Sequence, residues 1–218
     1  MVYRFTIVIL ICVIERIINK MLVSFDGPNG AGKTTIIQKV NEELSKTYKI
    51  FITREPTNDA FGDYVKENKF SLYGLSYLFL IAANRAEHSE KELIPHMKDI
   101  ILCDRYIISS LALQHAEGVS LDCIWNINKC FPQPDICFVI SASAESLDSR
   151  IIKREKKSHF EKILSRQEEI NLYKEAFAFA SSKRNNVYWI ENNEGSLSDN
   201  IRTIIDIILN IYGENQHG

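Results

Sequence analysis

The sequence predicts an α/β domain in which a five-stranded parallel sheet lies between two layers of helices. Five short apolar runs, each typical of a buried strand, alternate along the chain with longer helical segments. A glycine-rich motif joins the first apolar run to the first helical segment. No internal repeat or Gly/Ser-rich linker divides the 218 residues, a length that suits one domain with a full-sized core.

The order of the elements follows from the apolar pattern. The predicted strands lie at 22–25, 50–53, 100–103, 136–140 and 187–190. The predicted helices lie at 33–47, 60–69, 74–98, 106–130, 144–183 with a break near 155–160, and 196–212. Strands that alternate with helices form βαβ units, which place parallel strands in one sheet and helices on both its faces. Ligands of such a sheet bind beyond the carboxyl ends of the strands.

Composition limits the partners and the compartment. The 26 Lys and Arg residues against 28 Asp and Glu give a net charge of −2, which predicts neither a nucleic acid nor a membrane as a partner. The five cysteines are odd in number and scattered, which argues against a disulfide framework or a zinc cluster and indicates a cytoplasmic protein. They are Cys12, Cys103, Cys123, Cys130 and Cys137.

Residues 1–20 precede the first strand and form an apolar extension. The run at 5–14 is interrupted only by Thr6 and is too short to span a bilayer, which takes about 20 residues. Three interpretations stay open: an appendage left by an upstream start site, with Met21 as the natural start; an extra helix or strand on the domain; and a targeting segment. The domain itself is predicted over 21–213, with a tail at 214–218.

The glycine-rich motif reads GPNGAGKT and satisfies the pattern G-x-x-x-x-G-K-[ST]. Because it lies between a strand and a helix, its backbone amides can wrap a phosphate at the helix N-terminus. We expect Lys33 to reach the β and γ phosphates of ATP and the Thr34 hydroxyl to coordinate Mg²⁺. The predicted ATP-binding residues are Gly27, Pro28, Asn29, Gly30, Ala31, Gly32, Lys33, Thr34 and Thr35.

Charged motifs follow the second and third strands. They read TREPT from Thr53 and DRY from Asp104. Transfer between two phosphates requires cations that neutralise the acceptor phosphate, and forked guanidinium groups do this better than ammonium groups. Arg54 and Arg105 each follow a strand and are predicted to bind that phosphate. Asp104 is placed to hold Mg²⁺ through water or to orient Arg105.

Together with AANRAEH at 82–88, these motifs resemble the thymidylate kinase family in order and spacing over about residues 21–212. The resemblance implies a three-layer αβα P-loop kinase fold that transfers the γ-phosphoryl group of MgATP to dTMP. It also implies a homodimer packed through helices. By the same resemblance, Arg85 hydrogen-bonds the pyrimidine base and Gln114 closes the nucleoside pocket. The predicted acceptor-binding residues are Asn29, Arg54, Ile81, Arg85, Arg105 and Gln114.

A basic segment after the fourth strand is predicted to form a short helical lid at about 150–162. In nucleotide kinases a mobile segment at this place closes over ATP and adds positive charge. The predicted lid cations are Arg150, Lys153, Arg154, Lys156, Lys157 and His159. The resemblance places Arg154 against adenine, and the predicted catalytic residues are Lys33, Asp104, Arg105 and Arg154.

The chain departs from the family pattern at several positions. Asn29 replaces an aspartate at the acceptor sugar, and the lid pair Asp-Arg reads Ser158-His159. Ile81 and Leu113 stand where aromatic rings are usual, so that Ile81 or Phe79 would have to pack on the base. Two alternatives therefore remain: a kinase for another deoxynucleotide or a deoxynucleoside, and a nucleotide-binding regulator with weak catalysis.

Overall fold

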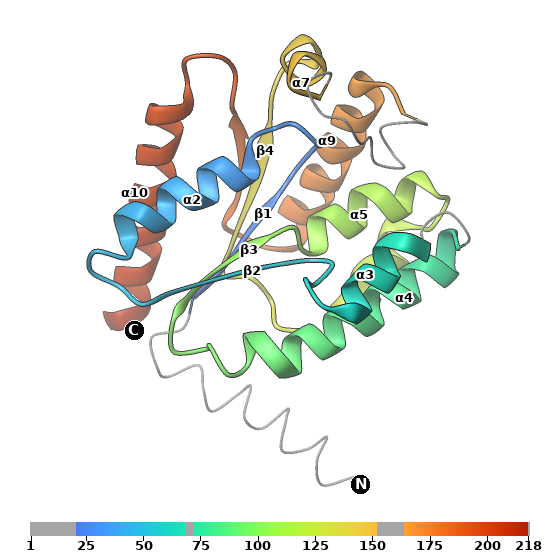
Figure 1. The fold of residues 1–218 in the computed structure, drawn as a ribbon, viewed down its shortest axis with the longest axis horizontal. Coiled ribbons are helices and arrows are strands. Elements are labelled where there is room, and N and C mark those ends of the chain that lie inside the picture. The colour runs from blue at the N-terminus through green and yellow to red at the C-terminus, as the bar shows by residue number, and fades with distance from the viewer. Residues whose placement is uncertain (1–20, 69–71, 152–163, 218) are drawn as a thin grey trace, which may run out of the picture.

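Five parallel strands form the centre of the computed structural model, which describes residues 21–68, 72–151 and 164–217 (Figure 1). Their order in the sheet is β2-β3-β1-β4-β5. Each predicted strand is confirmed and extends at most one residue further at either end. The strands are β1 (Met21–Asp26), β2 (Ile50–Arg54), β3 (Ile100–Asp104), β4 (Ile136–Ser141) and β5 (Val187–Glu191).

The central strand β1 pairs with β3 on one side and β4 on the other. Every residue of β1, β3 and β4 is buried, whereas the edge strands β2 and β5 are partly exposed. Strands covered by helices on both faces need apolar residues on both, which explains their unbroken apolar runs. Strand β1 lies between β3 and β4, neither of which directly follows it in the chain. A ligand crevice forms at such a switch point in the strand order.

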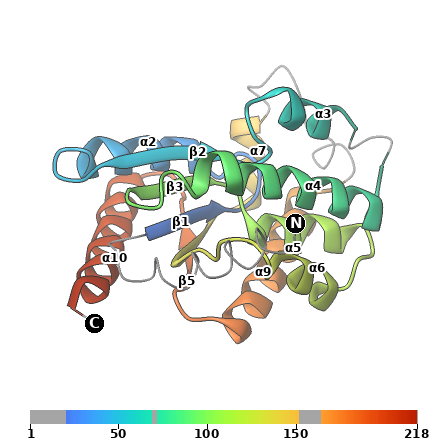
Figure 2. The same ribbon diagram turned by 90° about the horizontal axis from the view of Figure 1, so that it is seen from below.

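Two helices cover one face of the sheet. These are α2 (Lys33–Leu44) and α10 (Leu197–His217), which lie together in Figures 1 and 2. Alternate residues of β1, beginning with Met21 and ending with Phe25, pack with Ile36 of α2 and Ile204 of α10. The alternation follows from the two-residue period of a strand.

The opposite face carries four helices: α4 (Gly74–His88), α5 (Ile107–Ala116), α6 (Leu121–Asn128) and α9 (Arg166–Lys183). Their core includes Leu22 of β1, Leu111 of α5 and Tyr173 of α9. Two shorter helices, α3 (Ala60–Asn68) and α7 (Ala144–Ile151), lie above the carboxyl ends of the strands. Within the described ranges, no helix has the length and apolar character needed to cross a membrane.

Several predicted helix boundaries were wrong. The segment predicted as one helix at 106–130 forms α5 and α6, because Gly118 adopts a φ of 88° and the Ser120 side chain caps α6. The helix predicted at 74–98 ends at His88 and continues as the π-helix η2 (Ser89–Leu93), in which Ile94 N–H donates to Ser89 O. Helix α2 ends three residues earlier than predicted. The predicted break near 155–160 lies outside the described residues.

Candidate active site

The phosphate loop between β1 and α2 depends on glycine. Gly27, Gly30 and Gly32 have φ values of 135°, 83° and 92°, a region that other L-residues rarely adopt. A Cβ atom on Gly27 would overlap the carbonyl oxygen of Ile140, and one on Gly32 would lie 2.6 Å from Nδ2 of Asn192. The loop is thus pressed against the ends of β4 and β5, at the edge of the sheet where ligands of this fold class bind.

Lys33 begins α2 and turns toward the loop that precedes it. Its Nζ donates to the carbonyl oxygens of Gly27 and Pro28, each at 2.8 Å, and the residue is only 7% exposed. Burial and, to a smaller extent, the positive charge of Arg105 lower the pKa of Lys33 to about 7. A bound anion would therefore stabilise the charged form of Lys33.

Arg105 is held on the other side of the loop in an unusual backbone conformation, with a φ of 71°. Its N–H donates to Phe25 O, and the carboxylate of Asp26 accepts from the N–H groups of Tyr106 and Ser109. Arg105 Nη2 donates to Oδ1 of Asn29 at 2.6 Å. Asp26 thus fixes the start of α5, and with it the direction in which Arg105 leaves the sheet.

Among the residues that the structure describes, no carboxylate oxygen lies within 4.0 Å of the side-chain nitrogens of Lys33 or Arg105. Both cations bind neutral oxygens instead. Buried charges are normally paired, because an unpaired charge in a protein interior is costly. Two such cations on either side of a phosphate loop form a binding site for a polyanion.

Thr34 and Asp104 lie together, as predicted for a magnesium site. The Thr34 hydroxyl donates to Oδ2 of Asp104 at 3.0 Å. A hydroxyl and a carboxylate are oxygen ligands of the kind that Mg²⁺ prefers, alongside phosphate oxygens and water. This pair lines a cavity of about 270 Å³ whose wall also includes Arg54, Asn58 and Glu92.

Arg54 and Arg105, both predicted to bind the acceptor phosphate, line different cavities. Arg54 lines the cavity beside Thr34, and Arg105 lines a second cavity on the other face of the sheet. Successive residues of a strand point to opposite faces. Because Thr53 turns toward α4 and contacts His88, Arg54 turns toward α2.

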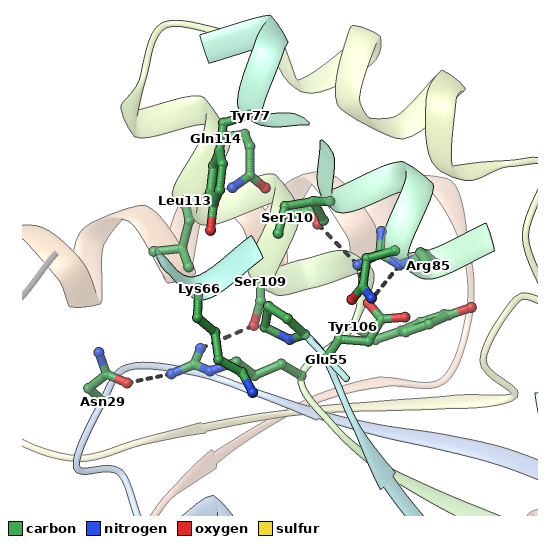
Figure 3. Close-up of a pocket in the computed structure, with 14 residues that line it drawn as sticks. Asn29, Glu55, Lys66, Tyr77, Arg85, Tyr106, Ser109, Ser110, Leu113 and Gln114 are labelled. Atoms are coloured by element: carbon green, nitrogen blue, oxygen red, sulfur yellow. Dashed lines mark hydrogen bonds and ion pairs between the residues drawn. The ribbon is translucent and has the colours of Figure 1, made fainter. Parts of the chain in front are cut away.

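The second cavity, of about 130 Å³, is lined by five of the six residues predicted to bind the acceptor, all except Arg54 (Figure 3). Asn29, which binds Arg105, and Arg85 lie on opposite sides of it in Figure 3. Helices α4 and α5 supply most of its wall. The lining residues are Asn29, Glu55, Pro56, Lys66, Tyr77, Ile81, Asn84, Arg85, Arg105, Tyr106, Ser109, Ser110, Leu113 and Gln114.

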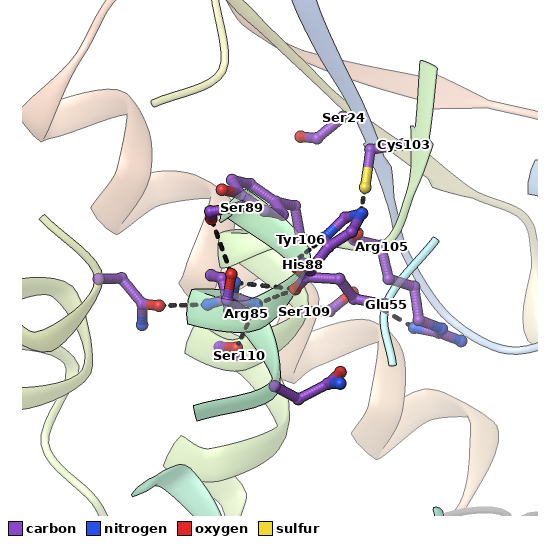
Figure 4. Close-up of polar contacts among 12 residues, drawn as sticks. Ser24, Glu55, Arg85, His88, Ser89, Cys103, Arg105, Tyr106, Ser109 and Ser110 are labelled. Atoms are coloured by element: carbon purple, nitrogen blue, oxygen red, sulfur yellow. Dashed lines mark hydrogen bonds and ion pairs between the residues drawn. The ribbon is translucent and has the colours of Figure 1, made fainter. Parts of the chain in front are cut away.

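Arg85 lies deep in a buried polar network at the end of this cavity (Figure 4). Its Nε and Nη2 donate to Oε2 of Glu55 at 2.8 and 2.5 Å, Nη1 donates to Asn128, and Nη2 also donates to Ser110. Four of its five N–H groups thus donate within the protein. The guanidinium group lies over the Tyr106 ring, 4.7 Å from its centroid.

His88 completes this network and has a structural place in it. Its Nδ1 lies 2.9 Å from Oε1 of Glu55 and its Nε2 lies 2.7 Å from Oγ1 of Thr53. Burial raises the pKa of Glu55, but the positive charge of Arg85 and the hydrogen bond from His88 outweigh it, and the pKa is lowered. The Glu55 carboxylate therefore stays ionised and anchors Arg85.

Gln114 offers a free acceptor to the cavity. It is 2% exposed, and its Oε1 has no hydrogen-bond partner in the described part of the chain. A buried unpaired acceptor is unfavourable unless a ligand donates to it. Ile81 and Leu113 line the wall of the cavity, whereas Phe79 is 58% exposed and is absent from the lining.

Tyr77 and Lys66 line the cavity but belong to none of the predicted motifs. Tyr77 lies one helical turn before Ile81 and two before Arg85, so it shares their side of α4 and supplies an aromatic ring. The spacing of four residues between Tyr77 and Ile81 could have indicated that Tyr77 lines the same site. Lys66 of α3 donates to Thr57 O at 3.0 Å and adds a cation to the cavity, which no motif indicated.

Arg150, one of the predicted lid cations, contacts the phosphate loop. It lies in α7, where Nη1 donates to Gly30 O at 3.2 Å and Nη2 donates to Asn192 O at 2.9 Å. It therefore supports the phosphate loop from outside. The other predicted lid cations, Lys153, Arg154, Lys156, Lys157 and His159, lie outside the described residues.

The sequence matches the family model described as thymidylate kinase over residues 25–201. A thymidylate kinase of Staphylococcus haemolyticus is 35% identical over 145 residues, which are 62% of this chain and 70% of that protein. A probable thymidylate kinase of Pyrococcus abyssi is 33% identical over 161 residues, 69% of this chain and 78% of that protein.

Solved structures give the same likeness in three dimensions. The thymidylate kinase of Ehrlichia chaffeensis superimposes with a TM-score of 0.65 at 25% identity and covers 87% of this chain and 98% of that one. The thymidylate kinase of Candida albicans superimposes with a TM-score of 0.67 at 20% identity, covering 90% and 93%. The second likeness bears on the fold alone.

Proposed function

The chain belongs to the thymidylate kinase family of ATP-dependent phosphotransferases, and we propose that it transfers the γ-phosphoryl group of MgATP to dTMP. The observation that carries the proposal is the pair Lys33 and Arg105, two buried cations bound to neutral oxygens on either side of the phosphate loop. Lys33 faces the donor loop and Arg105 faces the acceptor cavity. The products are ADP and dTDP.

On the donor side, the loop amides and Lys33 bind the ATP phosphates, and Lys33 exchanges its carbonyl partners for phosphate oxygens. Thr34 and Asp104 would hold Mg²⁺, Asp104 through water, and the ion neutralises phosphate charge. We also propose Arg154 as a catalytic cation that lies against adenine, as the family resemblance implies. No general base is required, because the acceptor oxygen already belongs to a phosphate.

On the acceptor side, Arg105 binds the phosphate of the acceptor, with Asn29 beside it and Lys66 lining the same cavity. These cations favour an acceptor that already carries a phosphate over a nucleoside. Arg54, at the magnesium side, is proposed to approach the transferred phosphoryl group from the other face of the sheet.

At the base end, Arg85 supplies a donor and Gln114 an acceptor. Thymine and uracil present carbonyl oxygens and an N–H at N3, which complement this pair. Cytosine has an acceptor at N3 and an amino group in place of one carbonyl, so both contacts would be mismatched. A mismatched buried polar contact costs about 1–3 kcal/mol.

Assembly and compartment are further parts of the proposal. Leu75 and Phe79 lie one turn apart on α4 and are exposed, which supports a homodimer packed through this helix. The scattered cysteines support a cytoplasmic location.

The function is tested by ADP release measured over a panel of dTMP, dUMP, dCMP, dAMP, dGMP and thymidine. We expect dTMP and dUMP to exceed dCMP in kcat/KM by at least about tenfold, from the mismatch at the base. Thymidine should give no turnover. A best rate with dCMP, dAMP or dGMP, or an unchanged ranking in Arg85→Ala, would overturn the choice of acceptor.

The phosphotransferase class has its own control in the same assay. Lys33→Ala should abolish turnover, whereas Lys39→Ala, an exposed residue of the same helix paired with Glu42, should leave it unchanged. Tight ATP binding by the wild type without turnover on any acceptor would favour the nucleotide-binding regulator instead.

A further inference from the structure

Helix α9 presents two buried polar residues to the active site. Glu169 and Tyr173 lie one turn apart, and they are 1% and 0% exposed. The Asn29 N–H of the phosphate loop donates to Oε1 of Glu169 at 3.1 Å. The Tyr173 hydroxyl lies 2.8 Å from Nη1 of Arg105. No sequence motif pointed to this helix.

Tyr173 makes the shortest of three contacts to Nη1 of Arg105. The other two are Gly27 O at 3.1 Å and Ser109 Oγ at 3.3 Å. An N–H of a guanidinium group is best held by one nearby oxygen in line with it, and contacts beyond about 3.2 Å are weak. Tyr173 is therefore the group best placed to fix this side of the guanidinium.

The direction of the hydroxyl proton is determined by its surroundings. Arg105 can only donate, so the Tyr173 oxygen must accept from it. The hydroxyl proton then goes to Ser109 Oγ, at 3.2 Å. Burial raises the pKa of Tyr173 to about 12, so that the hydroxyl keeps its proton at neutral pH.

A neutral oxygen orients a cation without cancelling its charge. A carboxylate at the same place would also hold Arg105, but it would compete with the phosphate of the acceptor. The backbone at Arg105 has a positive φ. The guanidinium group at the end of its side chain needs support to keep its direction toward this phosphate. The hydroxyl of Tyr173 supplies that support and leaves the full charge available.

We propose that Tyr173 is a positioning residue for phosphoryl transfer, whose hydroxyl holds the guanidinium group of Arg105 in the direction of the acceptor phosphate. Tyr173 contacts neither nucleotide and acts only through Arg105. The proposal rests on the proposed role of Arg105 at the acceptor, and it adds a residue from α9 to the transfer machinery.

The test is Tyr173→Phe, which removes one oxygen atom and keeps the buried ring. We expect kcat/KM for the acceptor to fall about tenfold, the loss typical of one hydrogen bond to a charged group. The KM for ATP should stay unchanged, because Lys33 and the loop amides do not touch this hydroxyl. The matched control is Tyr188→Phe. The Tyr188 ring lies on β5 and packs on Phe138, away from the site.

A double-mutant cycle separates positioning from packing. In an Arg105→Ala background, Tyr173→Phe should have no further effect on kcat/KM, since there is no guanidinium left to orient. An equal loss in both backgrounds, or a loss below twofold in the wild-type background, would overturn the proposal. All variants are assayed well below their measured unfolding midpoints, so that a loss of stability does not enter the comparison.

The same cycle is run with whichever nucleotide proves the best acceptor of the wild-type enzyme. If dTMP is not that acceptor, the proposed function fails while the coupling between Tyr173 and Arg105 is still measured. If dTMP is that acceptor and the coupling is absent, only the role of Tyr173 fails.

Discussion

Lys33 shows how a single residue links protonation to ligand binding. Its folded pKa of about 7 lies below the ordinary value of 10.5, because the side chain is buried and close to Arg105. Between these two pH values the unfolded chain binds more protons than the folded one, so the contribution of Lys33 to stability rises with pH. ATP binding instead favours the protonated form of Lys33, because the negative phosphates attract the charged ammonium group.

We therefore predict that ATP binding takes up a proton at about pH 8, where the free folded protein holds Lys33 largely neutral. Calorimetric titrations in buffers of different ionisation enthalpy measure this uptake directly. Lys33→Arg is the matched control, because arginine stays protonated throughout this range and should show no uptake. Binding heats of the wild type that do not depend on the buffer would contradict the prediction.

The sequence predicts the position of a residue in the fold wherever that residue belongs to a motif at a strand end. Lys33, Thr34, Asp104 and Arg105 lie where the strand ends and the loop place them. Residues whose position depends on how helices pack were missed. Tyr173 lies 68 residues after Arg105 in the chain, and its contact with Arg105 exists only once α9 has packed on the sheet.

Among the elements, the phosphate loop and the α5–α6 junction use glycine for different reasons. Gly27 and Gly118 both have positive φ, but only Gly27 lacks room for a Cβ atom. The α5–α6 break could have been predicted from Gly118 followed by Ser120, a stop signal and a cap in succession. The strands needed no such detail, because unbroken apolar runs identify buried parallel strands.

This difference gives a prediction with a built-in control. Gly118→Ala should cost about 1–2 kcal/mol of unfolding free energy, the penalty of a side chain at positive φ, and should leave turnover intact. Gly27→Ala should cost more and abolish turnover, since the new methyl group meets the Ile140 carbonyl. Chemical denaturation and ADP release measure the two effects. Equal losses of stability would mean that the contact with Ile140 is not restrictive.

For the whole molecule, the described part of the sheet begins at Met21. Strand β1 begins at Met21, and both its partners, β3 and β4, lie within the described residues. Every contact of the phosphate loop reported above is made to residues after this point. The domain proposed over 21–213 therefore contains all of the described site.

We predict that a protein starting at Met21 has the same kcat/KM and the same thermal midpoint as the full-length chain. Thermal unfolding followed by circular dichroism, together with the ADP-release assay, compares the two. Aggregation or loss of activity on removing residues 1–20 would instead make that segment an integral part of the domain.

The position of β1 at the centre of the sheet also sets an order of events during synthesis. Of the described strands, β1 is made first, yet it pairs with none of the others until β3 has been translated. Gly27 meets the Ile140 carbonyl only after β4 has been made. A ligand stabilises only the states that contain its site. ATP in the cell therefore cannot rescue an early nascent chain of this protein, and protection by nucleotide begins only after β4 has joined the sheet.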